Sequence, residues 1–179
     1  SQDAALQNAP VSSEAADVPV AATNPQNIPE GTQAPAAQDE KKNLKTASPV
    51  SGETVAEYAM DCLSYNETTR DWRVHNGIDI AADAGTQVCA AAPGTVYTVF
   101  QDDTLGYTVV IRHDGGYTTQ YASLGENVSV KAGDVVQMGD PIGTVANTAL
   151  LESAQGDHLH FSVALNDKLI NPVTFLEMG

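Results

Sequence analysis

The chain has 179 residues, and its 23 acidic and 8 basic side chains give a formal net charge of −15. This length suits one domain with a tail. So acidic a chain repels phosphate backbones and anionic lipid headgroups, which argues against nucleic acid or a membrane surface as its partner and favours cell-wall material or protein.

Residues 1–48 are rich in Ala, Pro, Gln, Asn and Ser and contain no aromatic residue. Such a stretch cannot bury enough apolar surface to offset the entropy lost on ordering. We therefore predict a disordered linker or tether over residues 1–48 and a folded domain over residues 49–179. Residues 1–45 carry 6 acidic and 3 basic side chains (net −3), which leaves 17 and 5 (net −12) for the rest of the chain.

The sequence does not begin with Met, and it holds no apolar run of about 18 residues, the length that would indicate a membrane-spanning helix. We expect the chain to be part of a longer protein that carries an N-terminal targeting or anchoring segment.

Residues 49–73 precede the first histidine motif and include the single tryptophan, Trp72. We expect a strand here, with a buried Trp72 that anchors the edge of the domain. The alternative is that this segment shapes a substrate groove or a partner face. Cys62 also lies here, and Cys89 lies in an apolar run typical of a small buried side chain. Two cysteines do not make a disulfide framework, and a bridge between them stays open.

From residue 49 onward, short apolar or β-branched runs alternate with turns that contain glycine. The runs that we predict as strands are 94–100, 107–112, 117–121, 127–130 and 159–165. No stretch keeps an apolar period of 3.6 over three turns, so we predict an all-β domain. We interpret residues 147–157 as a loop beside the site described next.

Three of the four histidines fall into two short patterns, His75-Asn-Gly77-Ile-Asp79 and His158-Leu-His160. Side chains two residues apart on a strand point to the same face, so the two imidazoles of the second pattern project together. Gly77 lets the backbone bend or pass closely between the first histidine and the aspartate. A histidine alone is usually a hydrogen-bonding residue, but both patterns in one β domain predict a zinc site, and three protein ligands leave a fourth position open.

These two patterns resemble the M23 (LytM-type) zinc endopeptidases of bacterial cell walls. The likeness spans about residues 73–173 and includes Gly-Thr at 85–86, Gly-Thr-Val at 94–96, Gly-Asp at 133–134 and Asn-Pro at 171–172. The resemblance implies the antiparallel LytM fold, a duplicated hybrid motif. It also implies zinc ligands His75, Asp79 and His160, with His158 as the catalytic group that polarises or deprotonates water.

One position departs from this family. Active members carry a second catalytic histidine in a Tyr-x-His-Leu segment, and residues 121–124 of this chain read Tyr-Ala-Ser-Leu, which places Ser123 there. A serine hydroxyl cannot take a proton near neutral pH, and the loss of one such group costs on the order of 10² to 10³ in rate. Ser162 also replaces the usual glutamate, and His113 is expected to be a structural residue.

The serine at 123 and the C-terminal segment 171–176 resemble a degenerate branch of the family that acts in sporulation. This likeness implies a silent zinc-binding interaction module, anchored in the forespore membrane and facing the intermembrane space. The partner that it implies is a mother-cell membrane protein of the stage III sporulation AH type. Two alternatives stay open: an active or weakly active endopeptidase of peptidoglycan cross-bridges, and an M23-like regulator or wall-binding module outside sporulation.

Overall fold

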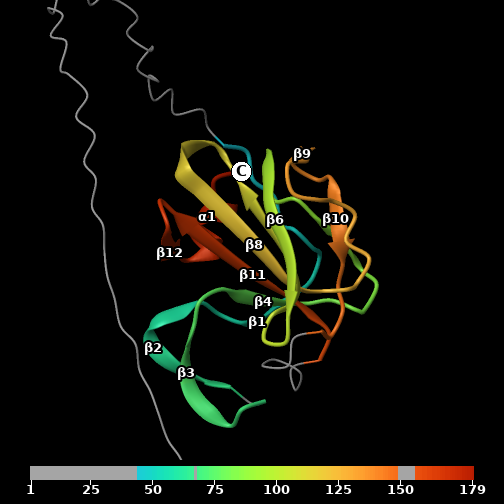
Figure 1. Cartoon of the computed structure of the whole chain (residues 1–179). Helices are drawn as coiled ribbons and strands as arrows, with labels where there is room; N and C mark the ends of the chain where they lie inside the picture. The colour runs from blue at the N-terminus through green and yellow to red at the C-terminus, as the bar shows by residue number, and fades with distance from the viewer. Residues whose placement is uncertain (1–43, 67, 149–155) are drawn as a thin grey trace, which may run out of the picture. The chain divides into compact units, whose positions relative to one another are not determined.

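The structure, a computed structural model, describes residues 44–66, 68–148 and 156–179 (Figure 1). Residues 1–43 of the predicted linker and most of the predicted loop 147–157 lie outside this part of the chain. No helix within these ranges is long and apolar enough to cross a membrane.

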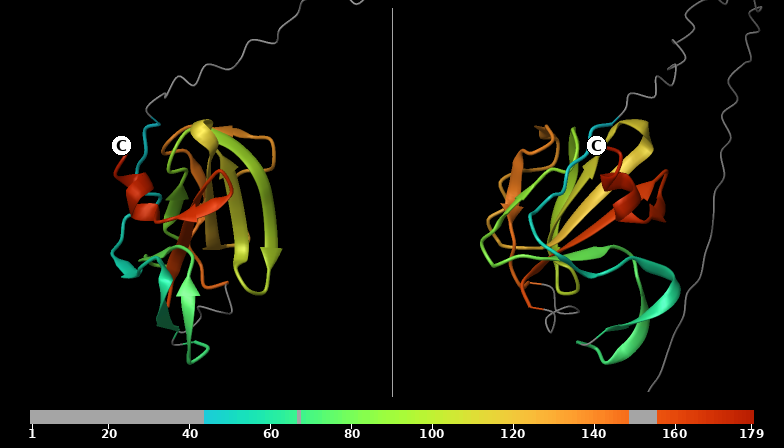
Figure 2. Two further views of the ribbon diagram at one scale, coloured as in Figure 1. Left: turned by 90° about the vertical axis from the view of Figure 1, so that its left-hand side faces the viewer. Right: turned by 180° about the vertical axis from the view of Figure 1, so that it is seen from behind.

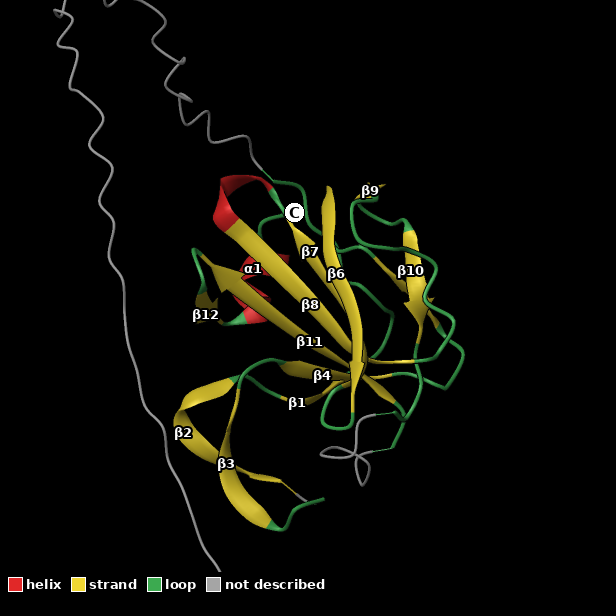
Figure 3. Cartoon of the chain, in the orientation of Figure 1, coloured by secondary structure: helices red, strands yellow, loops and turns green. Residues whose placement is uncertain are grey.

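One large antiparallel sheet dominates the domain. Its strand order is β1-β4-β11-β8-β7-β6-β9, with β12 paired to the remaining part of β11. The strands are β1 (Thr54–Ala56), β4 (Ile78–Ala81), β6 (Gly94–Asp102), β7 (Gly106–Arg112), β8 (Tyr117–Leu124), β9 (Val135–Val136), β11 (His158–Leu165) and β12 (Lys168–Ile170). Figure 3 shows how little helix accompanies them. The predicted all-β antiparallel class is therefore confirmed.

A second, two-stranded sheet completes the core. It pairs β5 (Gln87–Cys89) with β10 (Pro141–Thr144), which lies beside the large sheet in both views of Figure 2. Val88 and Ile142 of this sheet are fully buried, as are Tyr121 and Phe161 of the large one. These side chains belong to one apolar core, which fixes the strands that carry the site.

A hairpin of β2 (Ala59–Asn66) and β3 (Asp71–His75) forms a third sheet of its own. It extends away from the large sheet, below β4 in the view of Figure 1. Trp72 lies on this hairpin and is 64% exposed. The expectation of a buried Trp72 is therefore wrong, because no element packs over the hairpin's outer face among the described residues. Cys62 is exposed, Cys89 is half-buried, and both are free.

The predicted strand over residues 127–130 is not formed. Ser129 makes one backbone hydrogen bond to Ile142, and the apolar Val128 and Val130 pack against the core from a loop. Isolated bonds of this kind do not build a ladder. A short helix, α1 (Pro172–Leu176), ends the chain, with the Asn171 side chain accepting a hydrogen bond from the Val173 N–H.

Residues 44–48, which precede the predicted start of the domain, contact it through hydrogen bonds. The Thr46 hydroxyl is buried and donates to the carbonyl of Phe175 at 3.0 Å. The Ala47 N–H donates to the carbonyl of Ala91 at 2.8 Å. Residues 44–48 thus contact the folded domain, although their composition resembles that of the linker.

Candidate metal centre

Three strands bring the predicted ligands together. His75 ends β3, Asp79 lies in β4 and His160 lies in β11. β11 pairs with β4 in the register that places His160 directly opposite Asp79. The His-x-His pattern lies on a strand as predicted, with Leu159 fully buried in the core.

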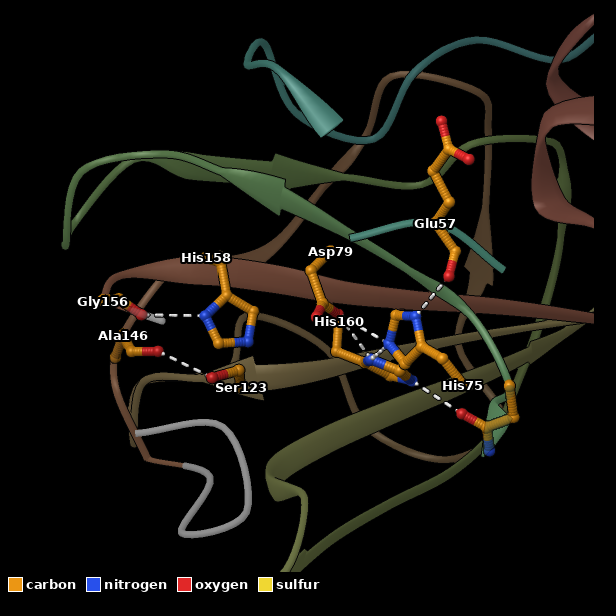
Figure 4. Close-up of polar contacts among 9 residues, drawn as sticks. Glu57, His75, Asp79, Ser123, Ala146, Gly156, His158 and His160 are labelled. Atoms are coloured by element: carbon orange, nitrogen blue, oxygen red, sulfur yellow. Dashed lines mark hydrogen bonds and ion pairs between the residues drawn. The ribbon is translucent and has the colours of Figure 1, made fainter. Parts of the chain in front are cut away.

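The ligand atoms form a compact triangle (Figure 4). Oδ1 of Asp79 lies 2.7 Å from Nδ1 of His160 and 3.2 Å from Nε2 of His75. The two nitrogens are 3.4 Å apart. Tetrahedral bonds of about 2.0 to 2.2 Å, the bond lengths of zinc sites, place ligand atoms about 3.3 to 3.6 Å apart. The two separations that involve His75 are close to this range, and the contact of Asp79 with His160 would lengthen around an ion.

The other ring nitrogen of each ligand histidine has a partner that fixes the tautomer. Nδ1 of His75 lies 2.8 Å from the Glu57 carbonyl oxygen, and Nε2 of His160 lies 3.1 Å from Oδ1 of Asn76. Because oxygens accept, each of these nitrogens carries the proton. The lone pairs of His75 Nε2 and His160 Nδ1 then point at Asp79 and the common centre, as metal-ligating histidines require.

Gly77 allows these strands to approach. A Cβ at this position would come within 2.5 Å of the Phe161 carbonyl oxygen and 2.9 Å of Nε2 of His160. A larger residue would therefore push β11 and its histidine away from Asp79. The predicted close passage of the backbone is what the structure shows.

The charge state of Asp79 fits a cation site. Burial raises the pKa of the Asp79 carboxyl, but the attraction of the neighbouring His160 and His75 rings outweighs burial and holds this pKa well below its usual range. Its second oxygen, Oδ2, is buried without a hydrogen-bond partner among the described residues. An unsatisfied carboxylate oxygen in a buried site is costly unless an ion or a donor meets it. The donor set of two imidazoles and one carboxylate therefore fits zinc.

His158 and Ser123 lie side by side next to this triangle (Figure 4). Nδ1 of His158 lies 2.8 Å from the Gly156 carbonyl oxygen, so Nδ1 carries the proton and Nε2 keeps its lone pair. The Ser123 hydroxyl donates to the Ala146 carbonyl at 3.0 Å. Ser123 is fully buried and has a φ of 61°, an uncommon backbone conformation for a residue other than glycine.

The fourth histidine belongs to a separate buried network. Nδ1 of His113 lies 2.7 Å from the Pro93 carbonyl oxygen, and Nε2 lies 2.7 Å from the Thr119 hydroxyl. That hydroxyl is 3.0 Å from the hydroxyl of Tyr121, which accepts from the Ala91 N–H at 2.8 Å. His113 and Tyr121 therefore join the segment between β5 and β6 to the large sheet.

A groove of about 470 Å³ opens onto the metal centre. Its walls come from the β2–β3 hairpin on one side and from the turn at Thr104 and Leu105 on the other, and its lining includes His75 and His160. Most of the remaining lining is apolar, with Met60 and Val74 as large members. The site is therefore reachable by an extended ligand.

The family model of peptidase family M23 matches residues 73–172. The chain belongs to peptidase family M23. This family match confirms the resemblance drawn from the two histidine patterns, and it ends at the Pro172 that opens α1.

Two curated relatives illustrate the range of the family. Stage II sporulation protein Q of Bacillus subtilis is 35% identical over 117 residues, which is 64% of this chain and 40% of that protein. The DD-carboxypeptidase/endopeptidase Mpg of Neisseria meningitidis is 38% identical over 103 residues, 58% of this chain and 23% of that protein. This chain therefore spans less than half the length of these relatives.

A solved structure shares the fold over most of the described domain. The structure of the SpoIIQ-SpoIIIAH pore forming complex contains a chain with a TM-score of 0.64 and 29% identity. The match covers 74% of this chain and 91% of that one. The likeness to the sporulation branch inferred from Ser123 is thus confirmed at the level of sequence and fold.

Two groups that orient the ligands were not predicted. Asn76 lies inside the first pattern, and its position beside a ligand histidine is a signal that sequence reasoning could have used. The Glu57 carbonyl leaves no trace in the sequence, because any residue type supplies the same backbone oxygen.

Proposed function

We propose that this domain holds one zinc ion through His75, Asp79 and His160 and acts in sporulation as a protein-interaction module with little or no peptidase activity. Ser123 gives this proposal its main support: by the family resemblance, it stands next to His158 where active members carry the second catalytic histidine. Zinc in a site with three protein ligands supplies Lewis-acid chemistry for hydrolysis.

Beside the proposed metal ligands, the site has a candidate general base for peptide hydrolysis but no second imidazole to stabilise the transition state. The contact of His158 Nδ1 with the Gly156 carbonyl orients the ring so that Nε2 is the nitrogen that would take a proton from an attacking water. The Ser123 hydroxyl already donates to the Ala146 carbonyl, and it carries no positive charge to stabilise a developing oxyanion. Binding at the centre is therefore retained, while stabilisation of the tetrahedral transition state is weakened.

The proposed partner is a membrane-anchored mother-cell protein of the stage III sporulation AH type. Support comes from the relative named stage II sporulation protein Q and from the solved SpoIIQ-SpoIIIAH complexes with the same fold. The domain would then be extracytoplasmic and tethered to the forespore membrane through an N-terminal helix, with residues 1–43 as part of the tether. Its acidic charge favours a protein or wall partner over a lipid surface.

The large sheet offers one route to such a contact. β9 pairs only with Gly94 and Thr95 of β6, and no strand among the described residues lies beside the rest of that edge. An open edge can accept a strand from another chain through main-chain hydrogen bonds.

An active or weakly active endopeptidase of peptidoglycan cross-bridges is the second candidate. It is favoured by the complete ligand triangle and by the groove that leads to it. In that case His158 alone would serve the attacking water. A regulator or wall-binding module outside sporulation is a third reading, which the same geometry supports without a catalytic step.

Three measurements on the purified domain test the proposal. Metal analysis should find one zinc per chain. Purified peptidoglycan should release no muropeptides, and the extracytoplasmic domain of a stage III sporulation AH-type protein from the same organism should bind. Robust muropeptide release would favour the endopeptidase, and an absence of binding would favour the third reading.

A further inference from the structure

Exposed apolar side chains gather in the β2–β3 hairpin and the strand before it. Of the thirteen exposed large apolar residues among the described ones, six lie within residues 55–74: Val55, Met60, Leu63, Tyr65, Trp72 and Val74. Single exposed apolar residues are normal on a protein surface, whereas a contiguous cluster marks an interaction site. The clustering of these six residues within one short segment therefore indicates an interaction surface.

Four of these side chains share one face of the hairpin. In β3, Trp72 and Val74 are exposed while Arg73 and His75 are half-buried, which is the alternation of a strand with two different faces. Tyr65 of β2 is paired directly with Trp72, and their rings meet edge-on at 5.6 Å. We name the arm face as Leu63, Tyr65, Trp72 and Val74, whose exposed fractions are 58%, 49%, 64% and 47%.

Among the described residues, no helix or strand covers the arm face. A two-stranded sheet is at best marginally stable in water unless another element covers an apolar face. The opposite face, with Arg73 and His75, borders the groove and the metal centre, and the groove also reaches Tyr65 and Val74 at the edge of the arm face. The chain thus keeps its aromatic pair on the side that its own fold does not cover, at the cost of exposing it in the free domain.

We propose that the arm face is the docking surface for the partner protein of the interaction role, and that the partner meets it with an apolar patch rimmed by Lys and Arg. The inference rests on the proposed function and adds the surface and its chemistry. Interfaces are enriched in Trp, Tyr and Met, and a few central aromatic residues supply most of the affinity. Trp72 is the anchor in this arrangement.

Charge selects the kind of partner. Glu53, which precedes β1, Glu57, which follows it, and Asp61 of β2 are exposed. The chain after residue 45 has 17 acidic and 5 basic residues, a net charge of −12. A basic rim on the partner complements this field and speeds encounter. A second copy of this chain would bring an equally acidic body to the contact, and like charges repel.

The test is a binding titration with the extracytoplasmic domain of a stage III sporulation AH-type protein from the same organism. Trp72→Ser should weaken binding by on the order of 10- to 30-fold, as expected for a central aromatic anchor. Leu63→Ser and Val74→Ser should act in the same direction, and Trp72→Phe should restore most of the affinity. Val173→Ser is the matched control, because Val173 is an exposed valine on α1, with 42% exposure against 47% for Val74. Raising the salt concentration should weaken binding.

The single tryptophan gives a direct readout of the surface. With 5-fluorotryptophan in this chain, only Trp72 yields a fluorine signal, and that signal should shift when the partner domain is added. Unchanged circular dichroism and zinc content in the variants would show that they fold.

The outcomes separate the two proposals. If the wild-type domain binds but the arm variants bind equally well and the fluorine signal stays in place, the arm proposal is overturned and the interaction role stands. If the wild-type domain does not bind, both fail. If sedimentation shows instead that the domain alone dimerises through Trp72, and more strongly in high salt, the face belongs to a second copy and the proposed partner chemistry is wrong.

Discussion

His160 and Asp79 lie directly opposite each other on paired strands, with Nδ1 of the histidine 2.7 Å from Oδ1 of the aspartate. Both side chains are almost fully buried, and the second carboxylate oxygen lacks a protein partner among the described residues. This pair, with His75 beside it, is the geometric basis for the proposed zinc site.

The first prediction concerns metal content. Asp79→Asn removes the anionic ligand while keeping the side-chain volume, and His75→Ala removes a ligand at the edge of the buried pair. Each variant should lose most of its zinc in metal analysis after dialysis. Full occupancy in both single variants would contradict the ligand assignment.

The second prediction concerns the group that orients His160. Asn76→Ala removes the oxygen that lies 3.1 Å from Nε2 of that histidine. Partners of this kind typically contribute about 10- to 100-fold to metal affinity. Competition with a chelator should show weaker zinc binding by this factor, while Asn127→Ala, at an exposed loop position, should leave the affinity unchanged. Equal affinities in the two variants would remove Asn76 from the site.

The sequence predicts the parts of this site that depend on local pattern. The alternation in β11 places His158 and His160 on one face and Leu159 in the core, as strand geometry requires. The pairing register that sets His160 against Asp79 is not local, because the two residues lie 81 positions apart and their approach depends on the whole sheet. The family resemblance, rather than the spacing, supplied that link.

The two wrong expectations, a buried Trp72 and a strand over residues 127–130, also concern contacts that are not local in the sequence. In β3 the apolar Trp72 and Val74 alternate with the polar Arg73 and His75, and this pattern identifies a two-faced strand without saying which face is covered. The size of Trp72 favoured burial, but β2 and β3 form a separate sheet with an uncovered outer face. Residues 127–130 likewise have the composition of a strand, yet no strand among the described residues pairs with them.

The third prediction concerns stability and pH. Burial lowers the pKa of His113 from its usual value near 6.5, although its bond to the Pro93 carbonyl opposes this shift. The folded protein therefore binds a proton less readily than the unfolded chain, so the free energy of unfolding should fall as the pH drops below about 6.5. Denaturant titrations at pH 7.5 and pH 5.5 should show a smaller loss for His113→Gln than for the wild type, compared at saturating zinc. An equal or larger loss in the variant would contradict the role of His113.

The fourth prediction concerns the N-terminal limit of the folded domain. The buried Thr46 hydroxyl donates to the Phe175 carbonyl, so we expect limited proteolysis to leave a resistant core that begins near residue 44. Thr46→Ala should lower the free energy of unfolding by about 1 kcal/mol through loss of this bond. A core that begins at residue 49 or later would show that this segment is not held.

The fifth prediction concerns Ser123, whose substitution tests the proposed lack of catalysis. His158 and the three proposed ligands are all present, so we attribute the proposed lack of activity to the missing second imidazole rather than to the metal set. Ser123→His should release muropeptides from purified peptidoglycan faster than the wild type, by on the order of 10²-fold if the new imidazole reaches the reacting centre. As a control, zinc content is measured in both proteins, so that a difference in metal content is not mistaken for a difference in catalysis.

The most direct measurement is muropeptide release by the unmodified, zinc-loaded domain from purified peptidoglycan, followed by chromatography over hours. We predict no release above a sample without protein, because a serine in place of the second imidazole would remove about 3 to 4 kcal/mol of transition-state stabilisation. Robust, zinc-dependent release by the wild-type domain would contradict it and identify the protein as an active endopeptidase.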